Sequence, residues 1–275
     1  MPAPIKLKRR LKAINSLNAI FKAMQVIAAV KLKKIKECHA AALYCLKQME
    51  AAAQHLDLAQ IIPPREKGKT LAVFFSSNRG FCGAFNTNLF NRVQNFAKEQ
   101  AGLSAPLEFM VFGHKGMEFL RAKKLAVKES HFEENLPFSF FGKIADEIKD
   151  SREIYIIYNR FKSLVRQETF ARRIMPYDGL PFSGNASHYL LEPEKEKLAR
   201  EWFKQLIAVR LYYSYMSSLY GEYSARVFTL KNAIENSQEL SAGLTLDLNK
   251  LRQQNITRDL LEIISSAESL KERGN

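Results

Sequence analysis

Two stretches of this chain repeat apolar residues in alternating steps of four and three, which limits its possible folds more than any other feature. The later stripe consists of Trp202, Leu206, Val209, Tyr213, Met216, Tyr220, Tyr223, Val227, Leu230 and Ile234. The earlier one consists of Leu7, Leu11, Ile14, Phe21, Ala28, Leu32, Ile35, Ala42, Leu46 and Met49. A repeat averaging about 3.5 residues is typical of coiled-coil helices, because it keeps one stripe facing a partner. We therefore expect two long helices, distant in sequence, to supply each other's buried face.

Helix-breaking residues divide the chain into three segments. No glycine or proline interrupts the stretch from Ile5 to Ile62, and Pro63-Pro64 ends it. The helical pattern returns at Glu194 and continues to about Leu270. These boundaries predict a coiled-coil helix over 1–62, a central domain over 63–193 and a second coiled-coil helix over 194–275.

The central segment alternates short apolar runs with amphipathic stretches. The runs 70–76, 107–112 and 153–161 have the length of strands, whereas 86–100, 113–124 and 143–149 have helical spacing. The run 167–175 alternates and fits an antiparallel edge strand. Strands alternating with helices predict a small, mostly parallel, Rossmann-like α/β domain. The fold class is therefore α/β plus long helices.

The stripe of the later helix changes after Ile234. Serines occupy two stripe positions, and the apolar positions then slip by one residue to Ile256, Leu260, Ile263, Ala267 and Leu270. This helix is also longer than its expected partner. We expect its far end to meet another chain.

Charge and cysteine content narrow the function classes. The formal net charge of the 275-residue chain is +14, and its first acidic residue is Glu37. Such a basic block is typical of a surface that binds nucleic acid, anionic lipid or an acidic protein; here it coincides with an apolar stripe, which favours a structured helix against an acidic protein. The odd set Cys38, Cys45 and Cys82 has no metal-ligand spacing and favours a reducing compartment. We also expect no transmembrane segment.

Candidate catalytic and nucleotide-binding motifs are incomplete. Gly68-Lys69-Thr70 resembles the end of a P-loop, but Pro63 stands where that motif needs its first glycine. The loop 78–86 lies between a strand and a helix, yet it holds Gly80 and Gly83 and not a full dinucleotide fingerprint. It is either a tight turn or, less favoured, an anion site. We predict no catalytic residue, no metal site and no cofactor.

Three stretches resemble the gamma subunit of F-type ATP synthases. The first is LKRRLKAINSLNAIFKAMQVIAAVKLKK, from Leu7 to Lys34, and the second is SSNRGFCGAFNTNLF, from Ser76 to Phe90. The third lies between Ser224 and Ile264 and contains SARVFTLKNAIEN, LTLDLNKLRQQNIT and DLLEII. They occur in the family's order and reach both ends and the middle of the chain.

The resemblance implies a central rotor shaft that is not catalytic by itself. It implies an antiparallel coiled coil threaded through a ring of alpha and beta subunits, with its base on the epsilon subunit and the membrane c-ring. The expected location is the cytoplasmic face of a bacterial inner membrane, as a peripheral protein. Rotation of the shaft would couple ion flow, of protons or sodium, to the catalytic beta subunits in synthesis or hydrolysis of ATP.

The resemblance also implies the residues that contact the ring. They are Met24, Arg226, Arg252, Gln253, Thr257 and Asp259, the last at a position where the family often has glutamate. Arg9 and Arg10 either line the ring or form an ordinary solvated face. The chain departs from the family's pattern at Leu17, Ala19, Phe21 and Val30, so the contacts of the first helix are those least fixed by the resemblance.

The sequence leaves two alternative interpretations of the function beside that of a rotor subunit. A nucleic-acid or adaptor protein would use the basic coiled coil, and its affinity would fall steeply with salt. A nucleotide-binding enzyme would use the α/β segment, against which the incomplete glycine motifs count.

Overall fold

The computed structural model describes residues 3–56, 58–102, 105–161, 167–177, 192 and 194–272. Two long helices, α1 (Ala3–Ala53) and α6 (Lys195–Glu272), are the first and last elements of the sequence, and all the others lie between them. The chain forms two compact units, one of 1–27 with 229–275 and one of 28–228. The larger unit thus takes in parts of both long helices as well as the central segment. The predicted three-segment division remains a proposal.

The α1 helix ends at Ala53, nine residues before the end at 62 that the prolines predicted. At its end the amide of Gln54 bonds to the carbonyl of Ala51, and the amides of His55 and Leu56 bond three residues back in the same way. Such i to i−3 bonds tighten and close the last turn of a helix. A separate short helix, α2 (Leu58–Ile61), follows the turn.

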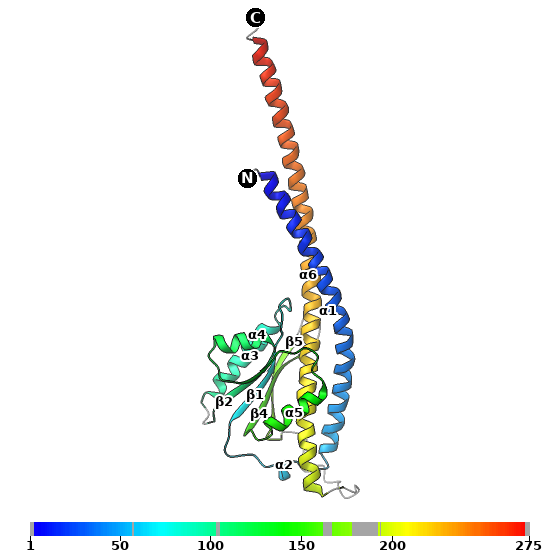
Figure 1. The fold of residues 1–275 in the computed structure, drawn as a ribbon, viewed down its shortest axis with the longest axis vertical. Helices are drawn as coiled ribbons and strands as arrows, with labels where there is room; N and C mark the ends of the chain where they lie inside the picture. The colour runs from blue at the N-terminus through cyan, green and yellow to red at the C-terminus, as the bar shows by residue number, and fades with distance from the viewer. Residues whose placement is uncertain are drawn as a thin grey trace. The chain divides into compact units, whose positions relative to one another are not determined.

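The larger unit contains a five-stranded sheet in the order β3-β2-β1-β4-β5 (Figure 1). Its strands are β1 (Thr70–Phe75), β2 (Leu107–Phe112), β3 (Val127–His131), β4 (Glu153–Phe161) and β5 (Gln167–Met175). The first four are parallel, and β5 pairs antiparallel with β4 at the edge. The mostly parallel sheet and its antiparallel edge strand are confirmed. The sequence analysis missed β3.

Helices cover both faces of the sheet (Figure 1). On one face, α3 (Phe85–Gln100) and α4 (His114–Ala122) pack on alternate residues of β1 and β2, such as Phe74 and Val111. On the other, α5 (Phe138–Ile148) and the early part of α6 pack on Phe75 and Phe112. The α5 helix starts five residues before the predicted 143, directly after Pro137. Successive residues of a strand point to opposite faces of the sheet, and helices cover both faces here. Every residue of β1 is therefore buried, which explains its continuous apolar run.

Within the larger unit, α1 and α6 run antiparallel. The Trp202 indole donates to the carbonyl of Met49, and farther along the pair Lys31 donates to Tyr223. The predicted stripe residues from Leu7 to Met49 on α1 and from Trp202 to Ile234 on α6 are all buried or half-buried, whereas Ile256, Leu260 and Ile263, beyond the slip, are exposed. In the smaller unit, Ser241 of α6 donates a hydrogen bond of 2.8 Å to Asn15 of α1. The apolar stripes therefore form helix-packing faces, as predicted.

One helix among the described residues, Ile5–Ala53, is by length and composition apolar enough to cross a membrane. Only 11% of its most apolar window is buried. Core helices of soluble proteins pass the same test of composition, so the result does not by itself place the helix in a bilayer.

Candidate functional site

The carboxyl edge of the sheet is where a doubly wound fold would bind a ligand. The strand order changes direction between β1 and β4, and in such folds the crevice beyond these two strand ends holds the ligand. Here α6 lies across that position. Ser218 of α6 donates to the carbonyl of Phe75 at the end of β1, and Ser217 donates to the carbonyl of Asn159 on β4, both at 3.4 Å.

The strand ends beneath α6 are also closed by their own polar contacts. The Asn159 side chain donates to the carbonyl of Phe85 at 2.9 Å and accepts from the Thr169 hydroxyl at 2.6 Å. Asn159 and Ser217 are fully buried, and Ser218 is nearly so. Hydrogen-bonded side chains thus occupy the position at which an enzyme of this topology would hold its substrate.

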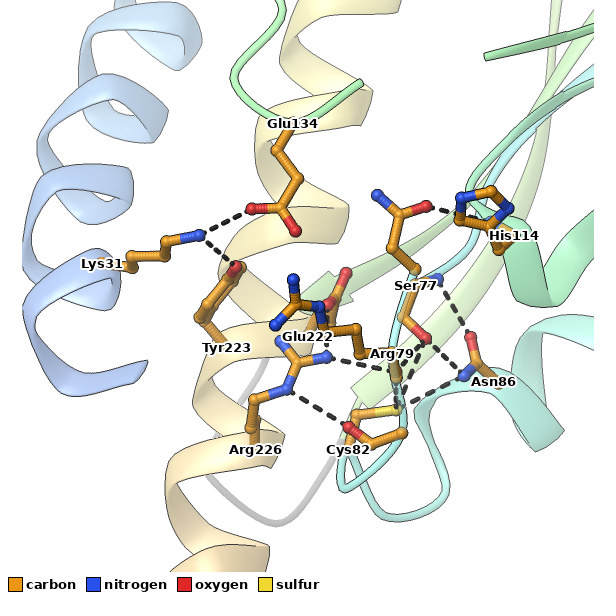
Figure 2. A network of polar contacts seen from close by, with 12 residues as sticks. Lys31, Ser77, Arg79, Cys82, Asn86, His114, Glu134, Glu222, Tyr223 and Arg226 are labelled. Carbon is orange, nitrogen blue, oxygen red and sulfur yellow. Dashed lines mark hydrogen bonds and ion pairs between the residues drawn. The ribbon is translucent and has the colours of Figure 1, made fainter. Parts of the chain in front are cut away.

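The loop between β1 and α3 is held by side chains at its two ends (Figure 2). Asn86 donates to the Ser77 hydroxyl at 2.7 Å and to the Cys82 sulfur at 3.4 Å, and Ser77 donates to the carbonyl of Arg79 at 2.8 Å. Phe81 and Gly83 both adopt left-handed backbone conformations, with φ of 59° and 55°. These contacts fold 78–84 into a tight turn, which was the favoured of the two predictions for this loop.

Two glycines let α4 approach this loop closely. A Cβ atom added to Gly116 would lie 2.6 Å from both the Ser76 hydroxyl and a Val111 methyl group, and one added to Gly113 would lie 2.3 Å from the Ser76 carbonyl. The Gly116 amide donates to the Ser76 hydroxyl at 2.8 Å. The Asn78 side chain accepts from the amide of His114 and donates to the carbonyl of Phe132.

Arg226 attaches this loop to α6. Its guanidinium donates to the carbonyls of Arg79 and Gly80, both at 3.3 Å, and forms an ion pair of 2.6 Å with Glu222 one turn earlier (Figure 2). Ala225 packs with Cys82 and Phe85 beside it. The loop therefore contacts α6 through one apolar cluster and one arginine.

Burial governs the electrostatics of this attachment. It raises the pKa of the Glu222 carboxyl, and the charge of Arg226 opposes that rise. It likewise raises the pKa of the Cys82 thiol. Buried charges are tolerated when they are paired and hydrogen-bonded, a condition that Glu222 and Arg226 meet together with the two loop carbonyls.

A second ion pair joins α1 to the loop before α5. Lys31 donates to the Glu134 carboxylate at 2.6 Å and to the Tyr223 hydroxyl at 3.3 Å (Figure 2). The hydrogen bond from Lys31 lowers the pKa of Glu134. Tyr223 lies between the two pairs, because the Arg226 guanidinium also stacks over its ring at 4.8 Å. Residues from α1, α6 and two loops thus form one polar network.

The predicted contact residues lie in different surroundings. Arg226 is buried in the network just described, whereas Met24 is half-buried on α1. The others are exposed, namely Arg9, Arg10, Arg252, Gln253, Thr257 and Asp259. Gln253 and Thr257 lie on one exposed surface of α6 with Lys250, Gln254, Arg258 and Leu261. The sequence analysis did not predict the roles of Lys31 and Glu134, because these partners lie far apart in sequence. It also missed Glu222, which is only one turn from Arg226 and could have been found from the i,i+4 spacing of opposite charges.

Comparisons with known proteins agree with one another. The family model for ATP synthase matches residues 5–270. The ATP synthase gamma chain of Geobacter sp. (strain M21) is 33% identical, over 96% of this chain and 98% of that one. That of Geotalea daltonii is 32% identical with the same coverage. The rotor of the Euglena gracilis mitochondrial ATP synthase has a TM-score of 0.67 at 16% identity, covering 92% of this chain and 98% of that one. The Tetrahymena thermophila central stalk has a TM-score of 0.59 at 22% identity, covering 78% and 99%.

Proposed function

Because the chain belongs to the family of ATP synthase gamma chains and is a non-catalytic subunit of the central stalk, we propose that it couples ion flow through a membrane ring to ATP synthesis or hydrolysis. Its partners on this proposal are the alpha and beta subunits around the long helices, and the epsilon subunit and c-ring at the base. The protein would be peripheral, on the cytoplasmic face of a bacterial inner membrane.

The observation that carries the proposal is the exposed apolar surface at the end of α6. Five large side chains there are 48–65% exposed, namely Ile256, Leu260, Leu261, Ile263 and Ile264. In the same unit α1 exposes Leu17, Ile20, Val26 and Ile27. Gathered apolar side chains of this size are typical of surfaces that another protein covers. Enclosure of α6 by a ring of subunits would remove them from water.

The coupling itself follows from asymmetry. A single shaft cannot present the same side chains to chemically identical beta subunits around it. Each rotational position would therefore favour a different conformation in each beta subunit, and such a shift requires contacts that differ between the states. Polar groups suit this task, because hydrogen bonds to charged groups contribute about 1.5–3 kcal/mol and can be exchanged between partners. We propose this role for Arg252, Gln253, Thr257 and Asp259, and for Arg9 and Arg10 on α1, with Met24 as an apolar contact to the ring.

Arg226 has a different role in the proposal. Its guanidinium already bonds to Glu222 and to the loop at 79–80, so it would act on a beta subunit through the position of that loop. A direct contact would require the guanidinium to leave a buried ion pair.

Reconstitution tests the function. The purified chain is mixed with its cognate alpha and beta subunits, and complex mass and ATPase activity are measured. We expect one copy of the chain per complex and more activity than alpha and beta give alone. Arg252→Ala should reduce the activity of the complex, whereas Arg121→Ala, at an exposed arginine on α4, should not. Failure of competent alpha and beta subunits to bind the chain would overturn the proposal.

A further inference from the structure

The larger unit contains a cavity to which the proposed stalk function assigns no role. Its volume is about 240 Å³, and it lies where α1, α6 and the loop before α5 meet. Its lining includes Lys31, Lys34 and Cys38 of α1, Glu134 of the loop, and Leu219 and Tyr223 of α6. We propose that this cavity binds a small amphiphilic carboxylate, with its apolar body inside and its carboxylate on Lys34.

The inner part of the cavity is apolar and preformed. Ile35, Leu136 and Met216 are each at most 9% exposed and are packed in place. The loop wall is fixed by a hydrogen bond of 3.4 Å from the Leu136 amide to the Tyr215 hydroxyl, beside Asn135 in a left-handed conformation with φ of 62°. A preformed apolar cavity with a few polar groups at its edge is the usual form of a small-molecule site.

The charge at the cavity favours an anion. Two lysines and one glutamate line it, and Lys31 already neutralises Glu134 at 2.6 Å. Lys34 is exposed, and within the described residues the structure gives it no ion pair. An ammonium group has three donors, so Lys31 also keeps one N–H beyond its bonds to Glu134 and Tyr223. Figure 2 shows Lys31 of α1, Glu134 of the loop and Tyr223 of α6 pointing toward one another.

The size of the cavity limits the ligand. At about 240 Å³ it is smaller than the roughly 300–1,000 Å³ typical of sites for drug-sized molecules. A phenyl ring on a short carboxylic acid fits a cavity of this size, whereas the paired acyl chains of a membrane lipid are too large for it. Since few atoms make contact, we expect affinity in the millimolar to high micromolar range.

Cys38 provides a direct measurement, because it lines the cavity and is half-buried. We would follow alkylation of the full-length chain by N-ethylmaleimide with mass spectrometry, with and without phenylbutyrate. The exposed Cys45 reports general reactivity, and the buried Cys82 reports unfolding. At a concentration of about 10 times Kd, the ligand should slow alkylation of Cys38 roughly tenfold and leave Cys45 unchanged.

Matched compounds and variants separate the proposal from nonspecific protection. Phenylbutanol and phenylbutylamine should protect Cys38 less than phenylbutyrate. Lys34→Gln should weaken protection roughly fivefold, as expected for an ion pair at a partly exposed site, whereas Lys33→Gln, outside the cavity, should not. Leu219→Trp should fill the cavity and abolish protection while Cys82 stays unreactive.

Three results would overturn the inference. They are no protection of Cys38 at several millimolar phenylbutyrate, equal protection by the alcohol and the amine, or equal protection of Cys45. None depends on ATPase activity, so failure here leaves the proposed stalk function untouched.

Discussion

Glu222 and Arg226 form an ion pair of 2.6 Å one turn apart on α6, and both side chains are only 8% exposed. Lys231 and Glu235 have the same spacing on the same helix, at 3.9 Å and 64% and 60% exposed. The spacing is identical, but the surroundings differ, because the loop at 79–80 covers only the first pair.

We expect Glu222→Gln to lower the free energy of unfolding by about 3 kcal/mol, because Arg226 would keep its charge in a buried position. Urea unfolding of the full-length chain measures the change. Glu235→Gln is the matched control and should cost less than about 0.5 kcal/mol. Equal losses in the two variants would show that the loop does not bury the first pair.

Gly116→Ala should be destabilising by about 1–3 kcal/mol, since its Cβ would lie 2.6 Å from Ser76 and Val111. Gly142→Ala is a control inside another short helix, with no heavy atom within 4 Å of the new Cβ. There the higher helix propensity of alanine should stabilise the chain by up to about 1 kcal/mol. Thermal unfolding of both variants checks the opposite signs.

The Lys31–Glu134 pair should make stability depend on pH. Because Lys31 lowers the pKa of Glu134, the folded protein binds this proton less readily than the unfolded chain does. The stabilisation is therefore present above about pH 4.5, the ordinary range of this carboxyl, and is lost as pH falls through the lowered pKa.

Glu134→Gln tests this dependence. Both side chains are 39% exposed, so the variant should cost no more than about 1 kcal/mol at neutral pH. The difference from the parent chain should shrink to nothing in acid, as followed by urea unfolding across the pH range. A gap that stays constant with pH would contradict the assignment.

Substitution at the exposed end of α6 should separate assembly from stability. Leu260 is 55% exposed, so Leu260→Ser should change the free energy of unfolding by less than about 0.5 kcal/mol but weaken the complex with alpha and beta subunits. Leu244 is 7% exposed in the same unit, and Leu244→Ala should cost about 2 kcal/mol. Unchanged assembly with Leu260→Ser would indicate that this surface is not covered by the ring.

The elements with a clear apolar repeat or a continuous apolar run were determined by local sequence. The stripes of α1 and α6 and the apolar runs of β1, β2 and β4 were all predictable, because burial on one or both faces leaves a periodic trace. The β3 strand was missed, since Val127–His131 contains no fully buried residue and therefore no apolar pattern. The early start of α5 was missed although its buried residues, Phe141, Ile144, Ala145 and Ile148, have helical spacing, so this part of the helix could have been predicted from the sequence.

Only the tertiary structure decided what each buried face meets. Periodicity shows that a residue faces inward, but it carries no information on a partner many residues away. The sequence indicated Arg226 through a family resemblance, and Glu222 lies one turn before it on the same helix. The burial of this pair and the bonds of Arg226 to the carbonyls of Arg79 and Gly80 depend on how α6 crosses the sheet. The same crossing places Ser217 and Ser218 over the strand ends. Long-range packing, which no local pattern encodes, therefore made this α/β edge a junction with α6.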